Sequence, residues 1–70
     1  MRYAVVIEKT ANNYSAYVPD LPGCVTTGAT IEEIEHNIRE AITFHLDGLR
    51  EDDLPIPTPS AVVAYCELAA

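Results

Sequence analysis

One long stretch of helical periodicity, with turn-forming residues on both sides, most constrains how this chain can fold. Its apolar residues recur mainly at spacings of three and four positions, which places them on one broad stripe of an α-helix. They are Ile31, Ile34, Ile38, Ala41, Ile42, Leu46 and Leu49. Thr30 and Glu33 have capping-box spacing and predict where the helix begins. The pattern stops near Asp52, and the alternate prolines of residues 54–60 (LPIPTPS) exclude a continuation of the helix.

Short β-forming runs on both sides of the helix predict the sheet that covers its stripe. Residues 2–9 (RYAVVIEK) and 13–18 (NYSAYV) favour a hairpin, because the polar residues between them can form a turn. A third strand is predicted over 24–28 (CVTTG) and a fourth over 61–69 (AVVAYCELA). The predicted class is therefore α+β, in the order β-β-β-α-β. An antiparallel-rich sheet would carry one long helix on one face, in a single domain over residues 1–70.

Both faces of the first and last predicted strands are apolar. One helix can cover only one face of a sheet, so the other apolar face needs a different cover. In the first strand Tyr3, Val5 and Ile7 alternate with Ala4 and Val6. Strands that are apolar on both sides are usually buried on both sides. Because a chain of 70 residues is near the lower size limit for a stable core, we expect a homodimer or homotetramer to cover the second face. A different protein could occupy that face instead.

The charge balance favours some partners over others. Four basic and eleven acidic residues give a formal net charge of −7, which would repel the phosphates of nucleic acids. Direct binding to DNA or RNA is therefore not expected, whereas a basic protein partner fits the charge. The same charge could also serve solubility alone. The sequence has no signal peptide and no apolar run long enough to cross a bilayer, so we expect a cytoplasmic protein without membrane contact.

The two histidines do not form a metal site within one chain. His36 and His45 are nine residues apart and project to opposite sides of a helix. His45 lies inside the apolar stripe, where a core or interface histidine is expected. His36 lies in an acidic line with Glu33, Glu40 and Asp47. Side chains at these spacings could hold a cation, but a solvated helix face is the simpler interpretation.

No arrangement typical of catalysis is present in the sequence. Ser15 and Ser60 lack the context of a nucleophile, and no glycine-rich phosphate loop occurs. Cys24 and Cys66 form no CxxC pair, so both are expected to be small core thiols. We predict that the chain is not an enzyme and needs no cofactor or metal.

The segment between the second strand and the helix contains two prolines and two glycines in VPDLPGCVTTGAT, residues 18–30. Such residues fix a sharp turn, so the loop is expected to set the corner between the second and third strands. A second interpretation is that the rigid loop presents Asp20 to a partner, since a preorganised loop loses less entropy on binding.

Nearly the whole chain carries a specific set of motifs. A strand ends in PDLPGC at residues 19–24, a helix entry of the form G-x-T-x-E-E follows at residues 28–33, and L-P-x-P follows the helix at residues 54–57. Asn37 and Glu40 continue the helix motif. With these segments the chain resembles the HicB-like antitoxin family of type II toxin-antitoxin systems.

Two positions depart from the pattern of that family. Ile34 stands where alanine is usual, on the buried stripe. Asp53 stands where glycine is expected, at a helix end with left-handed backbone, a conformation that aspartate tolerates better than most residues. The resemblance implies a partial ribonuclease H-like fold, without ribonuclease activity.

The resemblance also implies a function. Family members typically neutralise a small basic toxin of the HicA type, which cleaves mRNA, and an acidic antitoxin could do so by masking the RNA-binding surface of the toxin. The chain ends at Ala70 without a helix-turn-helix or ribbon-helix-helix segment. It is therefore expected to be a standalone short member that does not bind an operator. The alternative is a standalone structural or small-ligand-binding homo-oligomer with no toxin partner.

The predicted partner contacts combine the acidic helix line with residues of the first two strands and the proline loop. They are Glu8, Tyr14, Tyr17, Asp20, Glu33, Glu40 and Asp47.

Overall fold

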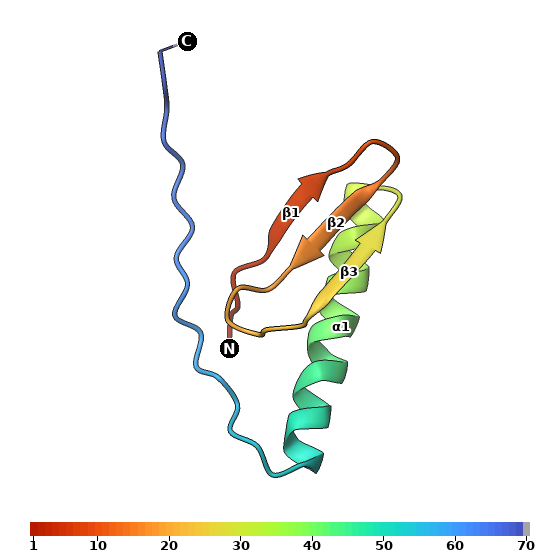
Figure 1. Cartoon of the computed structure of the whole chain (residues 1–70), viewed down its shortest axis with the longest axis vertical. Coiled ribbons are helices and arrows are strands. Elements are labelled where there is room, and N and C mark those ends of the chain that lie inside the picture. The colour runs from red at the N-terminus through yellow and green to blue at the C-terminus, as the bar shows by residue number, and fades with distance from the viewer. Residues whose placement is uncertain (70) are drawn as a thin grey trace.

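A computed structural model describes residues 1–69, which form three antiparallel strands followed by one long helix (Figure 1). The elements are β1 (Val6–Lys9), β2 (Tyr14–Tyr17), β3 (Val25–Gly28) and α1 (Ile31–Glu51). The sheet order is β1-β2-β3, so β2 is the central strand. This arrangement confirms the predicted α+β class, with the helix on one face of the sheet.

The β1–β2 hairpin turns at the polar residues that the sequence indicated. The backbone N–H of Thr10 donates to the carbonyl oxygen of Asn13 at 2.8 Å, and the Thr10 hydroxyl lies 2.6 Å from the Asn13 side-chain oxygen. The register of the sheet pairs Val6 with Tyr17 and Tyr17 with Val25. These three residues therefore form a row across the sheet.

The loop between β2 and β3 consists of two consecutive β-turns, which share Leu21. The N–H of Leu21 donates to the carbonyl of Val18, and the N–H of Cys24 donates to the carbonyl of Leu21, both at 3.0 Å. In the second turn Pro22 precedes Gly23, whose φ of 85° requires glycine in a type II turn. The loop places Leu21 in the core, where its side chain is fully buried. The loop thus fixes the corner between the two strands, as predicted.

Both ends of α1 have specific caps. The Thr30 hydroxyl accepts a hydrogen bond from the N–H of Glu33 at 3.1 Å, which confirms the predicted helix start. At the other end Asp53 has a φ of 55°, and the N–H of Leu54 donates to the carbonyl of Leu49 at 2.9 Å. This is a Schellman motif with aspartate in the left-handed position that usually holds glycine.

The core lies between α1 and the β2–β3 part of the sheet. Its buried residues are Ala16, Val18, Leu21, Cys24, Ile34, Ile38 and Leu46. Gly28 lies against the first turn of α1, where an added Cβ would be 2.9 Å from the backbone nitrogen of Ile34. The Asn37 side chain donates to the carbonyl of Thr27 at 2.9 Å and ties the helix to β3. The helix is thus held against the β3 side of the sheet.

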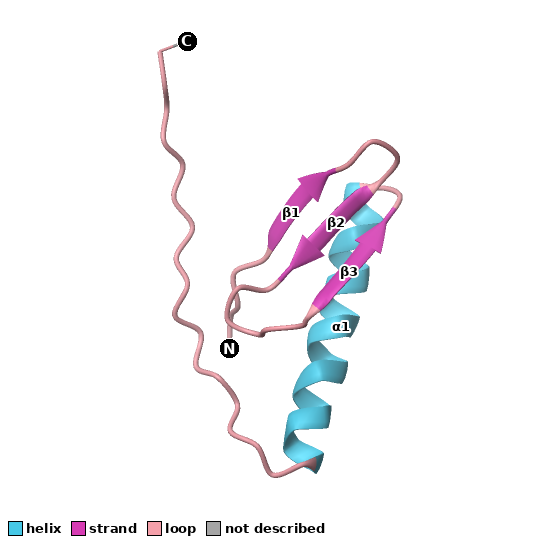
Figure 2. Cartoon of the chain, viewed as in Figure 1, coloured by secondary structure: helices cyan, strands magenta, loops and turns pink. Residues whose placement is uncertain are grey.

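The fourth strand, which was predicted over residues 61–69, is the element in which the structure differs from the prediction. Residues 54–69 run as an extended segment outside the sheet, and no strand is assigned in this part of the described chain (Figure 2). The β-forming composition of residues 61–69 predicted a strand, whereas the backbone there is extended but joins no sheet. A strand also needs a neighbour for its hydrogen bonds, and this segment has no such neighbour in the sheet. Cys66 is consequently exposed, so its predicted place in the core is wrong, whereas Cys24 is buried.

Candidate functional site

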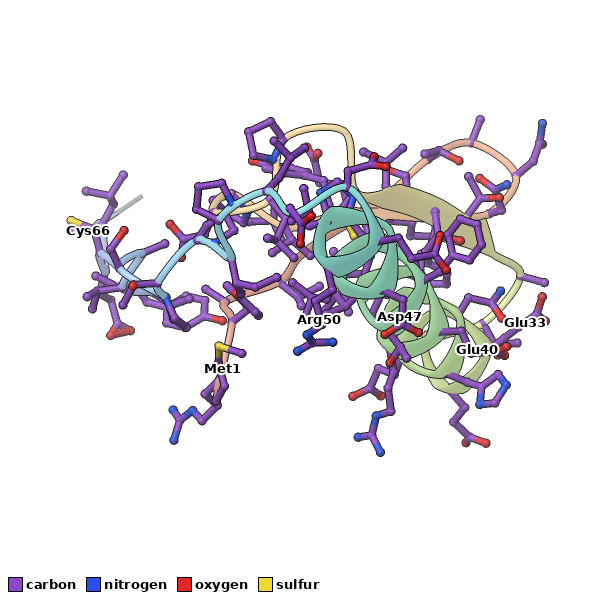
Figure 3. The ribbon with its side chains drawn as sticks, turned by 90° about the horizontal axis from the view of Figure 1, so that it is seen from below. Met1, Glu33, Glu40, Asp47, Arg50 and Cys66 are labelled. Carbon is purple, nitrogen blue, oxygen red and sulfur yellow. The ribbon has the colours of Figure 1, made fainter. Side chains whose placement is uncertain are left out.

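The acidic line of α1 is exposed along its whole length. Glu33, Glu40 and Asp47 lie on the outer side of the helix and point away from the sheet (Figure 3). The Nε2 atom of His36 lies 2.6 Å from a carboxylate oxygen of Glu40, and Asp47 forms an ion pair with Arg50 at 3.3 Å. Both pairs are solvated, and such pairs contribute at most about 1 kcal/mol. The carboxylates therefore remain available to a cationic partner.

The sheet face that the helix does not cover carries a short apolar row and a polar row. Val6, Tyr17 and Val25 form the apolar row, and Tyr17 and Val25 are exposed. Glu8 is paired across the strands with Ser15 in the neighbouring polar row. Two of the predicted contact residues, Glu8 and Tyr17, thus share this open face.

Tyr14 lies on the opposite face of β2. Its side chain is half-buried and packs against the core beneath α1. It is separated from Tyr17 by the sheet, as the alternation of a strand requires. Tyr14 therefore supports the fold and presents little surface to a partner.

The Asp20 carboxylate fastens the C-terminal segment to the loop between β2 and β3. Its oxygens accept hydrogen bonds from the backbone N–H groups of Ser60 at 2.9 Å and Ala61 at 3.0 Å, and from the Ser60 hydroxyl at 3.0 Å. The bonds from the Ala61 and Ser60 backbones stabilise the charged carboxylate and lower the pKa of Asp20 below its ordinary value. We call this arrangement the Asp20 clamp. The side chain that was predicted to meet a partner is engaged within its own chain.

Two hollows flank the helix. One, of about 390 Å³, lies between β1 and α1 and is lined by Tyr3, Val5 and Ile7 of the β1 segment and by Ile38 and Ile42 of the helix, among other residues. The other, of about 400 Å³, lies between α1 and the start of β3, and its lining includes His45 and the exposed Phe44. His45 is half-buried there, in agreement with a core or interface role.

The seven predicted contact residues do not form one surface. The acidic line lies on the outside of α1, whereas Glu8 and Tyr17 lie on the far side of the sheet. Asp20 belongs to the clamp and Tyr14 to the region beneath the helix. The structure therefore separates a helical acidic surface from an open sheet face.

Sequence reasoning missed the exposed aromatic ring of Phe44 and the free C-terminal segment. Phe44 is adjacent to His45 and falls outside the apolar stripe, which was the available signal that its ring is in solvent. Among residues 1–69 no group of histidine, cysteine, aspartate and glutamate side chains has the arrangement of a metal site. Within the same range, no helix has the length and apolar character that a membrane crossing requires.

Comparison with known proteins identifies related chains. Residues 3–69 match the model of a family described as the HicB-like antitoxin of bacterial toxin-antitoxin systems. A UPF0150 protein of Helicobacter pylori is 45% identical over 65 residues, which cover 91% of this chain and 90% of that one. An uncharacterised 14.9 kDa protein of Haemophilus phage HP1 is 42% identical over 65 residues, or 93% of this chain.

Some relatives are considerably longer than this chain. The matched region spans 49% of the Haemophilus phage HP1 protein. The protein named Antitoxin HicB 2 of Photorhabdus laumondii is 37% identical over 60 residues, which are 86% of this chain and 43% of that one. Among solved structures, a chain of the HicA3 and HicB3 toxin-antitoxin complex superposes with a TM-score of 0.75 at 33% identity. The match covers 86% of this chain and 70% of that chain.

Proposed function

The chain belongs to the HicB-like antitoxin family, and from this premise we propose that it neutralises a small basic HicA-type toxin by covering the RNA-binding surface of the toxin. Family membership indicates a non-catalytic role. The similarity to a chain of the HicA3 and HicB3 complex supports a toxin partner of the HicA type. Since the toxin would cleave mRNA, the encounter would take place in the cytoplasm.

The observation that carries the proposal is the acidic line on the outer face of α1. Glu33, Glu40 and Asp47 project from one rigid helix, so their carboxylates are presented at fixed spacing without ordering a loop. A basic toxin binds RNA through cationic side chains, and carboxylates on the antitoxin would compete with phosphates for the same groups.

The side-chain pairs on the helix are compatible with this exchange of partners. Glu40 and Asp47 are held by His36 and Arg50, and both pairs are exposed and on one helix. Breaking such a pair costs little in water, whereas a carboxylate enclosed against an arginine of a partner gains a stronger, charge-assisted contact. The net charge of −7 also attracts a cationic partner over a longer range and should speed association at low salt.

A binding titration with a catalytically inactive HicA-type toxin from the same organism tests the proposal. The variant combines Glu33→Gln, Glu40→Gln and Asp47→Asn. We expect about tenfold weaker binding and a flatter dependence of the affinity on salt. A matched control combines Glu35→Gln, on another side of the helix, with Asp52→Asn and Glu67→Gln, which removes the same charge away from the acidic line and should change the affinity less.

The two outcomes are distinct. If the control weakens binding as much as the helix variant, net charge and not the acidic line determines recognition. If the unaltered chain binds the toxin at no salt concentration, the proposed function is wrong.

A further inference from the structure

The segment that follows the Asp20 clamp leaves the domain with its apolar side chains in water. We call residues 62–69 the C-terminal arm. Val62 is 90% exposed, Tyr65 95% and Leu68 78%. Full burial of an apolar side chain of this size would contribute about 1.5–3 kcal/mol of stabilising free energy, which the exposed arm does not gain. An extended run of β-forming residues in this state has the composition of a strand that lacks its neighbour.

The base of the arm is held firmly beside the sheet. The Asp20 clamp fixes Ser60 and Ala61, and the Tyr3 hydroxyl donates to the carbonyl of Pro57. The prolines of residues 54–60 restrict the backbone before the clamp. Figure 1 shows the arm leaving this point on the β1 side of the sheet and running away without joining the sheet. The arm is thus presented in a defined direction.

A complementary site exists along β1, at one edge of the sheet. In the described part of the chain β1 is an edge strand, and its outer backbone groups have no partner strand. Within residues 1–69 the helix packs on β3 and β2 and not on β1. This offset leaves the hollow of about 390 Å³ between β1 and α1, whose lining includes Val5, Ile7 and Ile42. We call this hollow the groove. An incoming strand could bond to β1 and place alternate side chains in this groove.

We propose that the C-terminal arm of one copy pairs with β1 of a second copy and places apolar side chains in its groove. Each chain has one arm and one groove, so a two-fold exchange satisfies both at once. The face of the arm that carries Val62, Ala64, Cys66 and Leu68 is entirely apolar and matches the apolar part of the groove lining. Arg2, Glu35 and Arg39 also line the groove. The exchange supplies the missing neighbour of the predicted fourth strand, and it does not depend on the proposed toxin.

The structure favours a second copy over the same chain as the acceptor. The clamp and the Tyr3 contact are already formed, yet the arm beyond them stays exposed and outside its own sheet. Residues on an arm that is so placed are accessible to another molecule. Figure 3 shows Cys66 far from the helix, which makes this exposed thiol a convenient reporter of the contact.

Cross-linking of two distinguishable full-length chains tests the exchange. One chain carries a mass tag with Glu8→Cys and Cys66→Ser, and the other is the unaltered, untagged chain with Cys66 in its arm. They are mixed and treated with a short bismaleimide. Cys24 should stay unreacted, because it is buried and burial raises the pKa of its thiol. We expect a product of mixed mass, joined between position 8 and Cys66.

A matched control places the new cysteine on the opposite edge of the sheet. Thr27 lies in the same cross-strand row as Glu8 and is also exposed, so Thr27→Cys with Cys66→Ser differs only in the edge that it marks. This chain should give at least tenfold less of the mixed product. Equal products from both edges would overturn the proposal.

Further outcomes separate the other possible acceptors. A chain with Glu8→Cys and native Cys66 that cross-links internally at high dilution would show that the arm returns to its own β1. Cross-linking of the arm to a HicA-type toxin, without any product between copies, would assign the arm to the toxin. Either result contradicts exchange between two copies.

Analytical sedimentation provides an independent measurement of dimer formation. The variant Val62→Asp with Leu68→Asp should raise the dissociation constant of the dimer at least 100-fold. The helical signal in its circular dichroism should not change, because both side chains lie outside the core and away from α1. If the unaltered chain is a monomer at 100 µM or the variant dimerises equally well, the proposal fails.

Discussion

Two proline-rich segments of this chain have opposite structures. Residues 18–24 close into two turns and bury Leu21, whereas residues 54–60 stay extended and lead to the exposed C-terminal arm. In the first segment two residues separate the prolines, and Gly23 supplies the positive φ that closes the second turn. In the second segment every other residue precedes a proline, and that position favours extended backbone. The spacing of the prolines therefore decides whether the segment turns or extends.

The loop at residues 18–24 and the C-terminal arm also contribute differently to stability. The loop at residues 18–24 belongs to the core, and the Asp20 clamp joins it to the base of the arm. The arm beyond the clamp adds no buried side chain in the described structure. A substitution in the loop should consequently lower the free energy of unfolding much more than a matched substitution in the arm.

The largest expected effect comes from Leu21→Ala. Leu21 is fully buried, so its truncation leaves a cavity and should lower the free energy of unfolding by about 2–5 kcal/mol. The matched change Leu68→Ala in the arm should cost less than about 0.5 kcal/mol under conditions where the chain is monomeric. Urea titrations at low protein concentration measure both. Similar losses for the two leucines would contradict the division between loop and arm.

Gly28→Ala should have the next largest effect. A Cβ at Gly28 would lie 2.9 Å from the backbone nitrogen of Ile34, so β3 and the start of α1 must separate, at a cost of about 1–3 kcal/mol. Gly48→Ala is the control, because a Cβ at Gly48 meets nothing within 4 Å. This second change should stabilise the helix by about 0.5–1 kcal/mol. Thermal unfolding of the two variants should shift in opposite directions.

Asp53→Gly should produce a smaller effect of opposite sign. Asp53 has a φ of 55°, which glycine adopts without steric cost, so the helix end should gain about 0.5–1 kcal/mol. Asp52→Gly is the control, since Asp52 has a φ of −90° and gains no such relief. Thermal unfolding compares the two. A stabilisation that is equal in both would mean that the left-handed position is not strained.

Among these substitutions, Asp20→Ala should change the free energy of unfolding least. Its main effect should be on the protection of nearby amides against hydrogen exchange. The substitution removes the acceptor of the Ser60 and Ala61 N–H groups, so hydrogen exchange at these two amides should speed up while core amides keep their rates. In the unaltered chain, the lowered pKa of Asp20 means that the clamp is complete above the ordinary pKa of an aspartate. It is lost as the pH falls through the lowered folded-state value. Unchanged exchange in the variant would show that the clamp does not hold the arm.

Local signals account for most of the fold. The β1–β2 hairpin, the two-proline loop and the helix from its Thr30 cap to the left-handed Asp53 all follow from interactions within a few residues. Such interactions are visible in the sequence because capping and turn chemistry depend on near neighbours. The separation of Tyr14 from Tyr17 likewise follows from alternation along one strand.

Contacts between distant residues could not be predicted in the same way. The hydrogen bonds of Asp20 reach Ser60 and Ala61, which lie 40 and 41 positions away. The position of α1 over β3, which opens the groove beside β1, depends on packing and on the absence of a Cβ at Gly28. The fourth strand was predicted from composition, but composition does not specify which edge, if any, a strand will join.

The clamp also has a consequence for the order of events in folding. The turns of residues 18–24 close over a few positions, while the Asp20 clamp must bring together residues 40 positions apart and pays the entropy of a longer loop. We expect the hairpin, the loop and the helix to form before Ser60 reaches Asp20, because contacts between near neighbours form faster than contacts between distant residues. The direction of the arm would then be set late, so a chain would offer its arm to another molecule after its own core is complete.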